Sequence, residues 1–186
     1  VVYSVEKEPD FATNLRTGQW KSSGLARAFD SAIASGKGNA VSFADYENYA
    51  PSNGDPAAFV AQAIRDEAGT ALGVVAIQLP TALISNLVAT KVLDTGNSYV
   101  VGEGNTLRTF VATQKSIPIL KGMTDSEAVT QALQGKFGLT GGMTVDGKTG
   151  YVAANPVEFL GRKWAMIVEV AQSEIDGHAA AVGRQV

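Results

Sequence analysis

The sequence predicts an α+β protein built from two modules, each an antiparallel sheet flanked by helices. Three observations predict this class. The 186 residues are 45 % apolar and 18 % charged, a balance typical of globular proteins. A chain of this length forms one large domain or two small modules. An apolar hairpin pattern occurs in each half, and each half also contains a helical stretch among its strand-like runs.

The repeated hairpin is the main reason to expect two modules. Residues 59–61 match residues 151–153, and residues 73–79 match residues 164–170. Each copy consists of an apolar run, a turn that contains glycine and a second apolar run, which is the pattern of a β-hairpin. Because the copies lie half a chain length apart, they predict two modules of the same build, with the seam near residues 86–94.

The first half contains elements in the order strand, helix, strand, turn and hairpin. A short β-type run covers residues 1–5. Apolar residues at helical spacing predict a helix over residues 22–35, which the Gly-Lys-Gly-Asn sequence at residues 36–39 ends. Residues 40–43 predict a strand, and residues 49–56 have the composition of a turn. The hairpin follows and leads into a segment of helical character.

The second half repeats strands and one helix before its own hairpin. Residues 98–101 and 107–112 predict strands around a Gly-Glu-Gly-Asn turn. Residues 125–133 predict a short helix, for which Thr124 and Glu127 have the spacing of a capping box. An Asp-Gly turn then leads into the second hairpin.

Composition excludes several classes of function. The net charge of −3 and the isoelectric point of about 5.2 argue against a nucleic-acid binder, which needs clustered lysine and arginine. The chain has no cysteine, so disulfides, catalysis by a thiolate and cysteine-bound zinc are all excluded. No apolar run approaches the roughly 20 residues of a membrane span. The single histidine, His178, lies in an alanine-rich C-terminal stretch, where a solvated side chain is expected.

The sequence offers no catalytic constellation and no metal site. Residues 102–106 are glycine-rich but lack the lysine and hydroxyl residue of a phosphate-binding loop. No nucleophile, activating base and orienting group occur together. We therefore expect a protein that is not an enzyme and that has no cofactor and no metal. An enzyme that uses only Asp, Glu, Tyr or Lys stays open, and strongly shifted pKa values in a pocket would indicate it.

Polar aromatic residues are the better lead to a binding site. They combine an apolar ring with a hydrogen-bonding group, as residues that line small-molecule pockets do. Gln78 interrupts an apolar strand, and a buried amide there needs a partner. The alternative is that the aromatic residues belong to the core and Gln78 faces solvent. The candidate ligand-binding residues are Tyr3, Trp20, Asp45, Tyr46, Tyr49 and Gln78.

Five segments, which cover most of the chain, resemble one family of sensor domains. They are YSVEKEPDFATNL (3–15), SSGLARAF (22–29), FADYENYAPSNGDPAAFVA (43–61), DEAGTALGVVAIQLP (66–80) and DTGNSYVVGEGNTLRTF (94–110). The sequence resembles the extracytoplasmic double Cache domains of methyl-accepting chemotaxis proteins and of related membrane kinases and nucleotide cyclases. This family has two stacked PAS-like modules beside a long N-terminal helix.

The resemblance implies an organisation and a role. Residues 1–88 would form a membrane-distal module without its long helix, residues 89–177 a membrane-proximal module, and residues 178–186 a segment that leads toward a membrane helix. A small solute would bind in the distal module, and the signal would pass through the proximal one. The full-length receptor would be a homodimer in the inner membrane, with this part in the periplasm and both membrane spans outside this chain.

The chain departs from the amino-acid sensors of the wider family. Those carry an Arg-x-Trp-Tyr element that does not occur here, then a Tyr-x-Asp in which Tyr49 matches but Pro51 replaces the aspartate. Gln78 stands where their last aspartate would lie. We therefore expect a neutral or anionic ligand rather than an amino acid. Two alternatives stay open: the sensor of a histidine kinase or nucleotide cyclase, and a pocketless module that docks a periplasmic binding protein.

Overall fold

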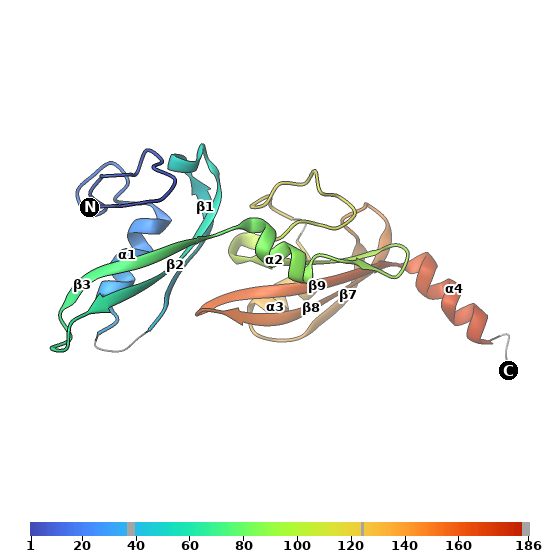
Figure 1. Ribbon diagram of the computed structural model, residues 1–186. Helices are drawn as coiled ribbons and strands as arrows, with labels where there is room; N and C mark the ends of the chain where they lie inside the picture. Colours follow the sequence, from blue (N-terminus) through green and yellow to red (C-terminus); the bar gives the residue numbers. More distant parts are fainter. Residues whose placement is uncertain (37–39, 124, 184–186) are drawn as a thin grey trace. The chain divides into compact units, whose positions relative to one another are not determined.

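The computed structural model describes residues 1–36, 40–123 and 125–183 and has an α+β fold with antiparallel sheets (Figure 1). The chain divides into two compact units, Val1–Pro80 and Thr81–Val186. The division falls before helix α2 (Thr81–Val88), whereas the sequence places that helix at the end of the first module. Each unit contains its own sheet and its own buried apolar cluster.

Unit 1 is a three-stranded antiparallel sheet with one α-helix against it. The strand order is β1-β2-β3, and α1 packs on β1 and β2. Helix α1 begins where the hydroxyl of Ser23 accepts a hydrogen bond from the amide of Ala26, the usual N-cap contact. The elements are α1 (Gly24–Ala34), β1 (Ser42–Tyr49), the 3₁₀ turn η1 (Ala50–Ser52), β2 (Asp55–Arg65) and β3 (Ala71–Leu79).

The turn between β1 and β2 has the expected chemistry. Asn53 and Gly54 both have positive φ values, 56° and 83°, which asparagine and glycine tolerate best. The turn brings Tyr49, the last residue of β1, opposite Asp55, the first residue of β2. A bulge between Ala44 and Glu47 shifts the register of β1, so the strand does not alternate regularly between its two faces.

Unit 2 is a six-stranded antiparallel sheet with the order β4-β5-β9-β8-β7, in which β6 pairs with β5. The repeated hairpins of the sequence are β2-β3 in unit 1 and β8-β9 here, so both are confirmed. The elements are α2, β4 (Lys91–Val92), β5 (Gly96–Gly102), the 3₁₀ turn η2 (Glu103–Asn105), β6 (Thr106–Leu107), α3 (Glu127–Leu133), β7 (Gly138–Met143), β8 (Thr149–Phe159), β9 (Arg162–Ala171) and α4 (Gln172–Gly183).

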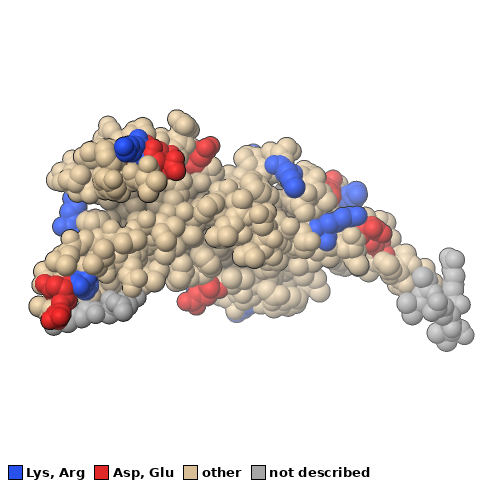
Figure 2. Space-filling view, viewed as in Figure 1, with Lys and Arg blue, Asp and Glu red and all other residues tan. Residues whose placement is uncertain are grey.

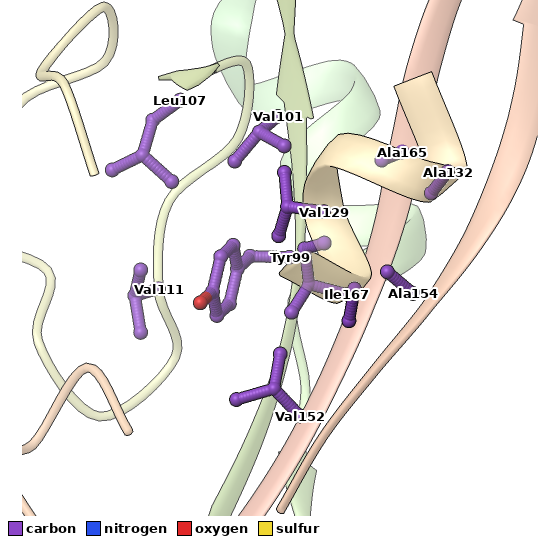
Figure 3. Packing of buried hydrophobic residues seen from close by; sticks show 11 residues of the cluster. Tyr99, Val101, Leu107, Val111, Val129, Ala132, Val152, Ala154, Ala165 and Ile167 are labelled. Carbon is purple, nitrogen blue, oxygen red and sulfur yellow. The ribbon is translucent and has the colours of Figure 1, made fainter. Parts of the chain in front are cut away.

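The core of unit 2 lies between α3 and the sheet. Helix α3 packs on β7, β8 and β9, and its buried Val129 faces the same cluster as Tyr99 and Ile167 (Figure 3). Leu107 and Val111 close the cluster from the segment that follows β5. Burial of these side chains stabilises the unit by roughly 1.5–3 kcal/mol for each large apolar residue.

Two expectations for local structure need correction, and a third lies outside the described residues. Residues 1–5 form no strand, because the side chains of Val1, Tyr3 and Val5 are exposed and do not pack on a sheet. The amide of Val2 nevertheless donates to the carbonyl of Thr13 at 2.9 Å. The predicted strand at 107–112 ends at Leu107. Helix α3 begins at Glu127, and the predicted cap at Thr124 lies outside the described residues.

Candidate functional site

A pocket of about 290 Å³ lies in unit 1, between the segment that leads into α1 and the end of β1. Its volume is near the lower end of the range for ligand pockets, about 300–1,000 Å³. Aromatic, hydroxyl, amide and carboxylate groups form its wall, so it offers both an apolar surface and hydrogen-bonding groups. The lining residues are Gln19, Trp20, Ser22, Ser23, Glu47, Asn48, Tyr49, Ala50 and Pro51.

Tyr49 is fixed from two sides. Its ring packs against that of Phe59 on β2 in an edge-to-face arrangement, with the ring centroids 4.8 Å apart. Its hydroxyl donates to Oδ2 of Asp10 at 2.7 Å, and both residues are almost wholly buried, with exposed fractions of 1 % and 4 %. Burial raises the pKa of the Tyr49 hydroxyl most, and the hydrogen bond to Asp10 and the nearby charges of Asp10, Glu8 and Glu47 raise it further. Tyr49 is therefore a neutral donor over the whole physiological pH range.

Glu47 connects the pocket to the start of α1. Its Oε1 accepts from the amide of Gly24, and its Oε2 pairs with the guanidinium of Arg27. Glycine at 24 permits this approach, because a Cβ atom there would lie 3.1 Å from Oε1. A carboxylate at a helix N-terminus is also favoured by the free amide groups of the first turn. Glu47 thus joins β1 to α1 at the pocket wall.

Trp20 also lines the pocket. Its indole Nε1 donates to the carbonyl of Pro9 at 3.3 Å, and the ring is half-buried. The N-terminal segment is held to the β1-β2 turn as well, where Ser52 donates to Oε2 of Glu8 at 2.9 Å. These contacts anchor residues 8–10 beside the pocket.

The structure brings two of the six predicted site residues, Trp20 and Tyr49, to this pocket. The ring of Tyr46 is buried, its hydroxyl lies 3.4 Å from the carbonyls of Leu79 and Pro80, and burial together with the charge of Asp45 raises its pKa to about 12. Asp45 accepts from the amide of Tyr46 at 2.7 Å. None of these three contacts involves a residue that lines the pocket.

Tyr3 and Gln78 lie on the surface. Tyr3 is 85 % exposed and packs only loosely on Phe11, with the ring centroids 5.6 Å apart. Gln78 is exposed on β3, opposite Phe59 in the register, and does not line the pocket. Ligand binding by these six residues stays a prediction.

Sequence reasoning missed the carboxylates near the pocket. Glu47 stands two positions before Tyr49, and strand alternation places such residues on the same face. The spacing of Glu47 and Tyr49 in the sequence therefore already indicates that both side chains lie near the pocket. Asp10 and Glu8 gave none, because their contacts with Tyr49 and Ser52 join residues 39 and 44 positions apart in the chain.

A smaller cavity of about 40 Å³ lies in unit 2, beside the core cluster. Glu169 on β9 lines it and is 1 % exposed. The hydroxyl of Tyr99 donates to its Oε2 at 3.1 Å, and the amide of Val145 donates to its Oε1 at 2.9 Å. Burial raises the pKa of Glu169, and these hydrogen bonds oppose the rise. The cavity has room for a few water molecules.

Charged side chains are sparse on the face of the molecule that Figure 2 draws. On the face that Figure 2 shows, acidic and basic side chains form small separate groups, and neither sign makes a continuous patch. Among the described residues, no group of three or more His, Cys, Asp or Glu side chains could hold a metal ion. No helix in the described part of the chain is both long and apolar enough to cross a membrane.

Comparison with solved structures identifies the fold. The ligand-binding domain of the Pseudomonas fluorescens chemoreceptor CtaA, solved with L-serine, superposes with a TM-score of 0.55 at 21 % identity and matches 90 % of this chain. The chain has the fold of a chemoreceptor sensor domain. The periplasmic sensory domain of the Campylobacter jejuni chemoreceptor Tlp1 superposes with a TM-score of 0.51 at 19 % identity over 73 % of the chain.

The sensor-domain fold also occurs in kinases. An extracellular domain assigned to a histidine kinase has a TM-score of 0.57 at 19 % identity over 74 % of the chain. This chain spans 65 % of the CtaA domain, 51 % of the kinase domain and 50 % of the Tlp1 domain. No family model matches the sequence, and neither does any curated protein.

Proposed function

We propose that this chain is the extracytoplasmic ligand-binding part of a transmembrane signalling receptor, most directly a chemoreceptor. It binds a small solute in unit 1 and passes a conformational change on through unit 2. The observation that carries the proposal is a polar and aromatic pocket in unit 1 of a chain with the fold of chemoreceptor sensor domains. The role is sensory rather than catalytic, and it needs no cofactor.

In this proposal the two units are Cache modules. Unit 1 corresponds to the membrane-distal module and unit 2 to the membrane-proximal one, as the repeated hairpins suggest. Helix α4 and the residues after it lead toward the membrane, and the full-length receptor works as a homodimer of the inner membrane with this part in the periplasm. Ligand binding shifts a two-state equilibrium of that dimer by its differential affinity for the two states.

A second candidate is the sensor of a membrane histidine kinase. The likeness to an extracellular kinase domain favours it, since its TM-score of 0.57 is as high as those of the chemoreceptor domains. The solute, the pocket and the direction of the signal are the same in both cases. They differ in the cytoplasmic output, which ligand-dependent autophosphorylation of the full-length receptor in membranes would test.

The experiment is a thermal-shift screen of the chain against amino acids, organic acids, amines, purines and sugars, followed by calorimetry on each hit. A ligand at 100 times its dissociation constant adds about 2.7 kcal/mol to the free energy of unfolding, which is easily detected. Trp20→Ala removes a pocket wall and is expected to weaken any hit at least tenfold. Gln78→Ala, on the exposed side of β3, is the matched control and is expected to change affinity less than twofold.

The outcomes separate the alternatives. A hit that depends on Trp20 supports direct sensing in unit 1. A hit that depends on Gln78 but not on Trp20 moves the site to β3 and contradicts the pocket assignment. A flat screen of a folded, cooperatively unfolding protein contradicts direct sensing and favours docking of a periplasmic binding protein.

A further inference from the structure

We propose that the outer edge of β3 is a strand-binding site, and that an extended segment of the same polypeptide, N-terminal to Val1, pairs there in antiparallel direction. This strand completes the sheet of unit 1 as β5 completes the sheet of unit 2. The inference concerns the fold of the unit that contains the pocket, and it does not depend on which solute binds.

The two repeated hairpins differ in what lies beside their second strand. In unit 2, β9 pairs with β8 on one side and with β5 on the other. Its counterpart in unit 1, β3, pairs with β2 alone. Among the described residues, no backbone hydrogen bond outside the β2-β3 ladder involves residues 71–79. The sheet of unit 1 is therefore open at the place that β5 fills in unit 2.

The outer edge of β3 is apolar and uncharged. The strand reads ALGVVAIQL, without a charged residue or a proline, and its Val75 and Ile77 are 53 % and 60 % exposed. Ala76 is exposed as well, whereas its counterpart in β9, Ile167, is wholly buried. Natural proteins protect free edge strands with charged residues and prolines, among other devices. An edge that lacks both indicates a strand that is paired in the whole protein.

Val2 in unit 1 and Leu107 in unit 2 make the same pair of backbone hydrogen bonds with the segment before the helix of their unit. The bonds are Val2 N to Thr13 O and Ala12 N to Val2 O, both 2.9 Å, Leu107 N to Lys121 O, 3.0 Å, and Leu120 N to Leu107 O, 2.9 Å. Ala12 and Leu120 also share a positive φ, 62° and 70°, which is uncommon for such residues. Val2 and Leu107 each pack on the core cluster of their own unit. Val2 is therefore the counterpart of Leu107.

This correspondence places the missing strand before Val1. In unit 2, β5 lies just before Leu107 in the chain, and its Val101 pairs with Leu107. Counted back from Val2 with the same spacing, the equivalent strand ends a few residues before Val1. Residues 1–23 contain no strand, and hydrogen bonds hold residues 8–10 beside the pocket. The occupant is therefore an upstream segment of the same polypeptide.

Unit 2 also indicates the composition of the missing strand. All seven residues of β5, GNSYVVG, are buried, and none is charged. The segment that pairs with β3 is expected to be a similar uncharged run that contains valine, isoleucine or an aromatic residue. A second copy of this chain is the alternative occupant, because a strand that pairs with its own copy about a two-fold axis is also antiparallel. Such a dimer has no counterpart in unit 2, so the upstream segment is favoured.

Disulfide cross-linking tests the pairing, since the 186-residue chain has no cysteine. In the longer protein, with any other cysteine replaced, Val75→Cys is combined with single cysteines placed one at a time along the residues encoded upstream of Val1. Cross-linking within one polypeptide is expected at one or two of these positions, because opposite residues of an antiparallel pair have Cα atoms about 4.5–5.5 Å apart. Ser42→Cys on β1, the opposite edge strand of the same sheet, is the matched control and is expected to cross-link with none of them.

Hydrogen exchange provides a second measurement that needs no variant. The amides of residues 71–79 are expected to exchange at least tenfold more slowly in the longer protein than in the 186-residue chain, because pairing closes the free edge. The amides of β1 are the internal control, and their exchange is expected to slow less than that of β3.

Three results would overturn the proposal. Failure of every upstream cysteine to cross-link with Val75→Cys within one chain refutes the pairing, and unchanged exchange of β3 in the longer protein does so too. Cross-links between two chains, with β3 exchange that slows as the protein concentration rises, assign the edge to a second copy. None of these results decides whether a solute binds in unit 1, so the proposed function stands or fails separately.

Discussion

Replacing Tyr49 with phenylalanine removes a single hydroxyl from the core of unit 1 and takes away the hydrogen bond that Asp10 receives there. The phenyl ring keeps the contact with Phe59, so the loss is confined to the polar pair. Hydrogen bonds to charged groups contribute about 1.5–3 kcal/mol, and a buried acceptor left without a donor carries its full desolvation cost. We expect Tyr49→Phe to lower the free energy of unfolding of unit 1 by about 2–3 kcal/mol.

The assay exploits the position of the two tryptophans, because Trp20 lies in unit 1 and Trp164 in unit 2. In a Trp164→Phe background the fluorescence of Trp20 reports on unit 1 during urea unfolding. Tyr3→Phe is the matched control, since the Tyr3 ring is 85 % exposed, and it is expected to cost less than about 0.5 kcal/mol. A loss for Tyr49→Phe no larger than that of Tyr3→Phe would refute the claim that the Asp10 contact stabilises the site.

The contact between Tyr49 and Asp10 also predicts how the stability of unit 1 changes at alkaline pH. The pKa of Tyr49 is raised in the folded chain above the ordinary tyrosine value of 10.0, because burial and the neighbouring carboxylates disfavour the phenolate. Its contribution to stability is therefore fully present below pH 10 and is lost as the pH rises toward the folded value. Between pH 9 and 11 the unfolding free energy of unit 1 is expected to fall more steeply in the wild type than in Tyr49→Phe.

Two further predictions concern unit 2, read from Trp164 fluorescence. Gly138→Ala places a Cβ 2.4 Å from the carbonyl oxygen of Ala128 in α3 and is expected to lower the free energy of unfolding by at least about 2 kcal/mol. Gly142→Ala on the same strand meets open space and is expected to lower it by no more than about 1 kcal/mol. Equal losses would contradict the close contact between helix and strand. Glu169 has a pKa raised by burial, so its contribution to stability is present below its unfolded pKa and is lost as the pH rises through the folded one. Urea unfolding between pH 4 and 7 is expected to show this fall in the wild type and not in Glu169→Gln, and identical pH profiles would contradict the buried carboxylate.

The hairpins, α1 and the β1-β2 turn follow from local patterns. Alternating apolar residues predict β8-β9, and Asn53-Gly54 predicts the tight turn because both residues accept positive φ values. Such features depend on neighbours in the chain, so a single sequence contains the necessary information.

The candidate site could be predicted only in part. Residue type alone points to Trp20 and Tyr49, but the partner of Tyr49 is Asp10, 39 positions away, and no local pattern connects them. Glu169 breaks an otherwise apolar strand, and on alternation a carboxylate there reads as solvent-facing. Its burial depends on donors from β5 and from the β7-β8 turn, which only the folded sheet brings together.

The most direct test of the central claim is the emission of Trp20 in the Trp164→Phe variant, titrated with the calorimetric hit from the screen. The account predicts a saturable change in Trp20 emission whose midpoint equals the calorimetric dissociation constant. A hit that binds by calorimetry but leaves Trp20 emission unchanged, while Trp164 emission responds in the Trp20→Phe variant, would place the site in unit 2 and contradict the account.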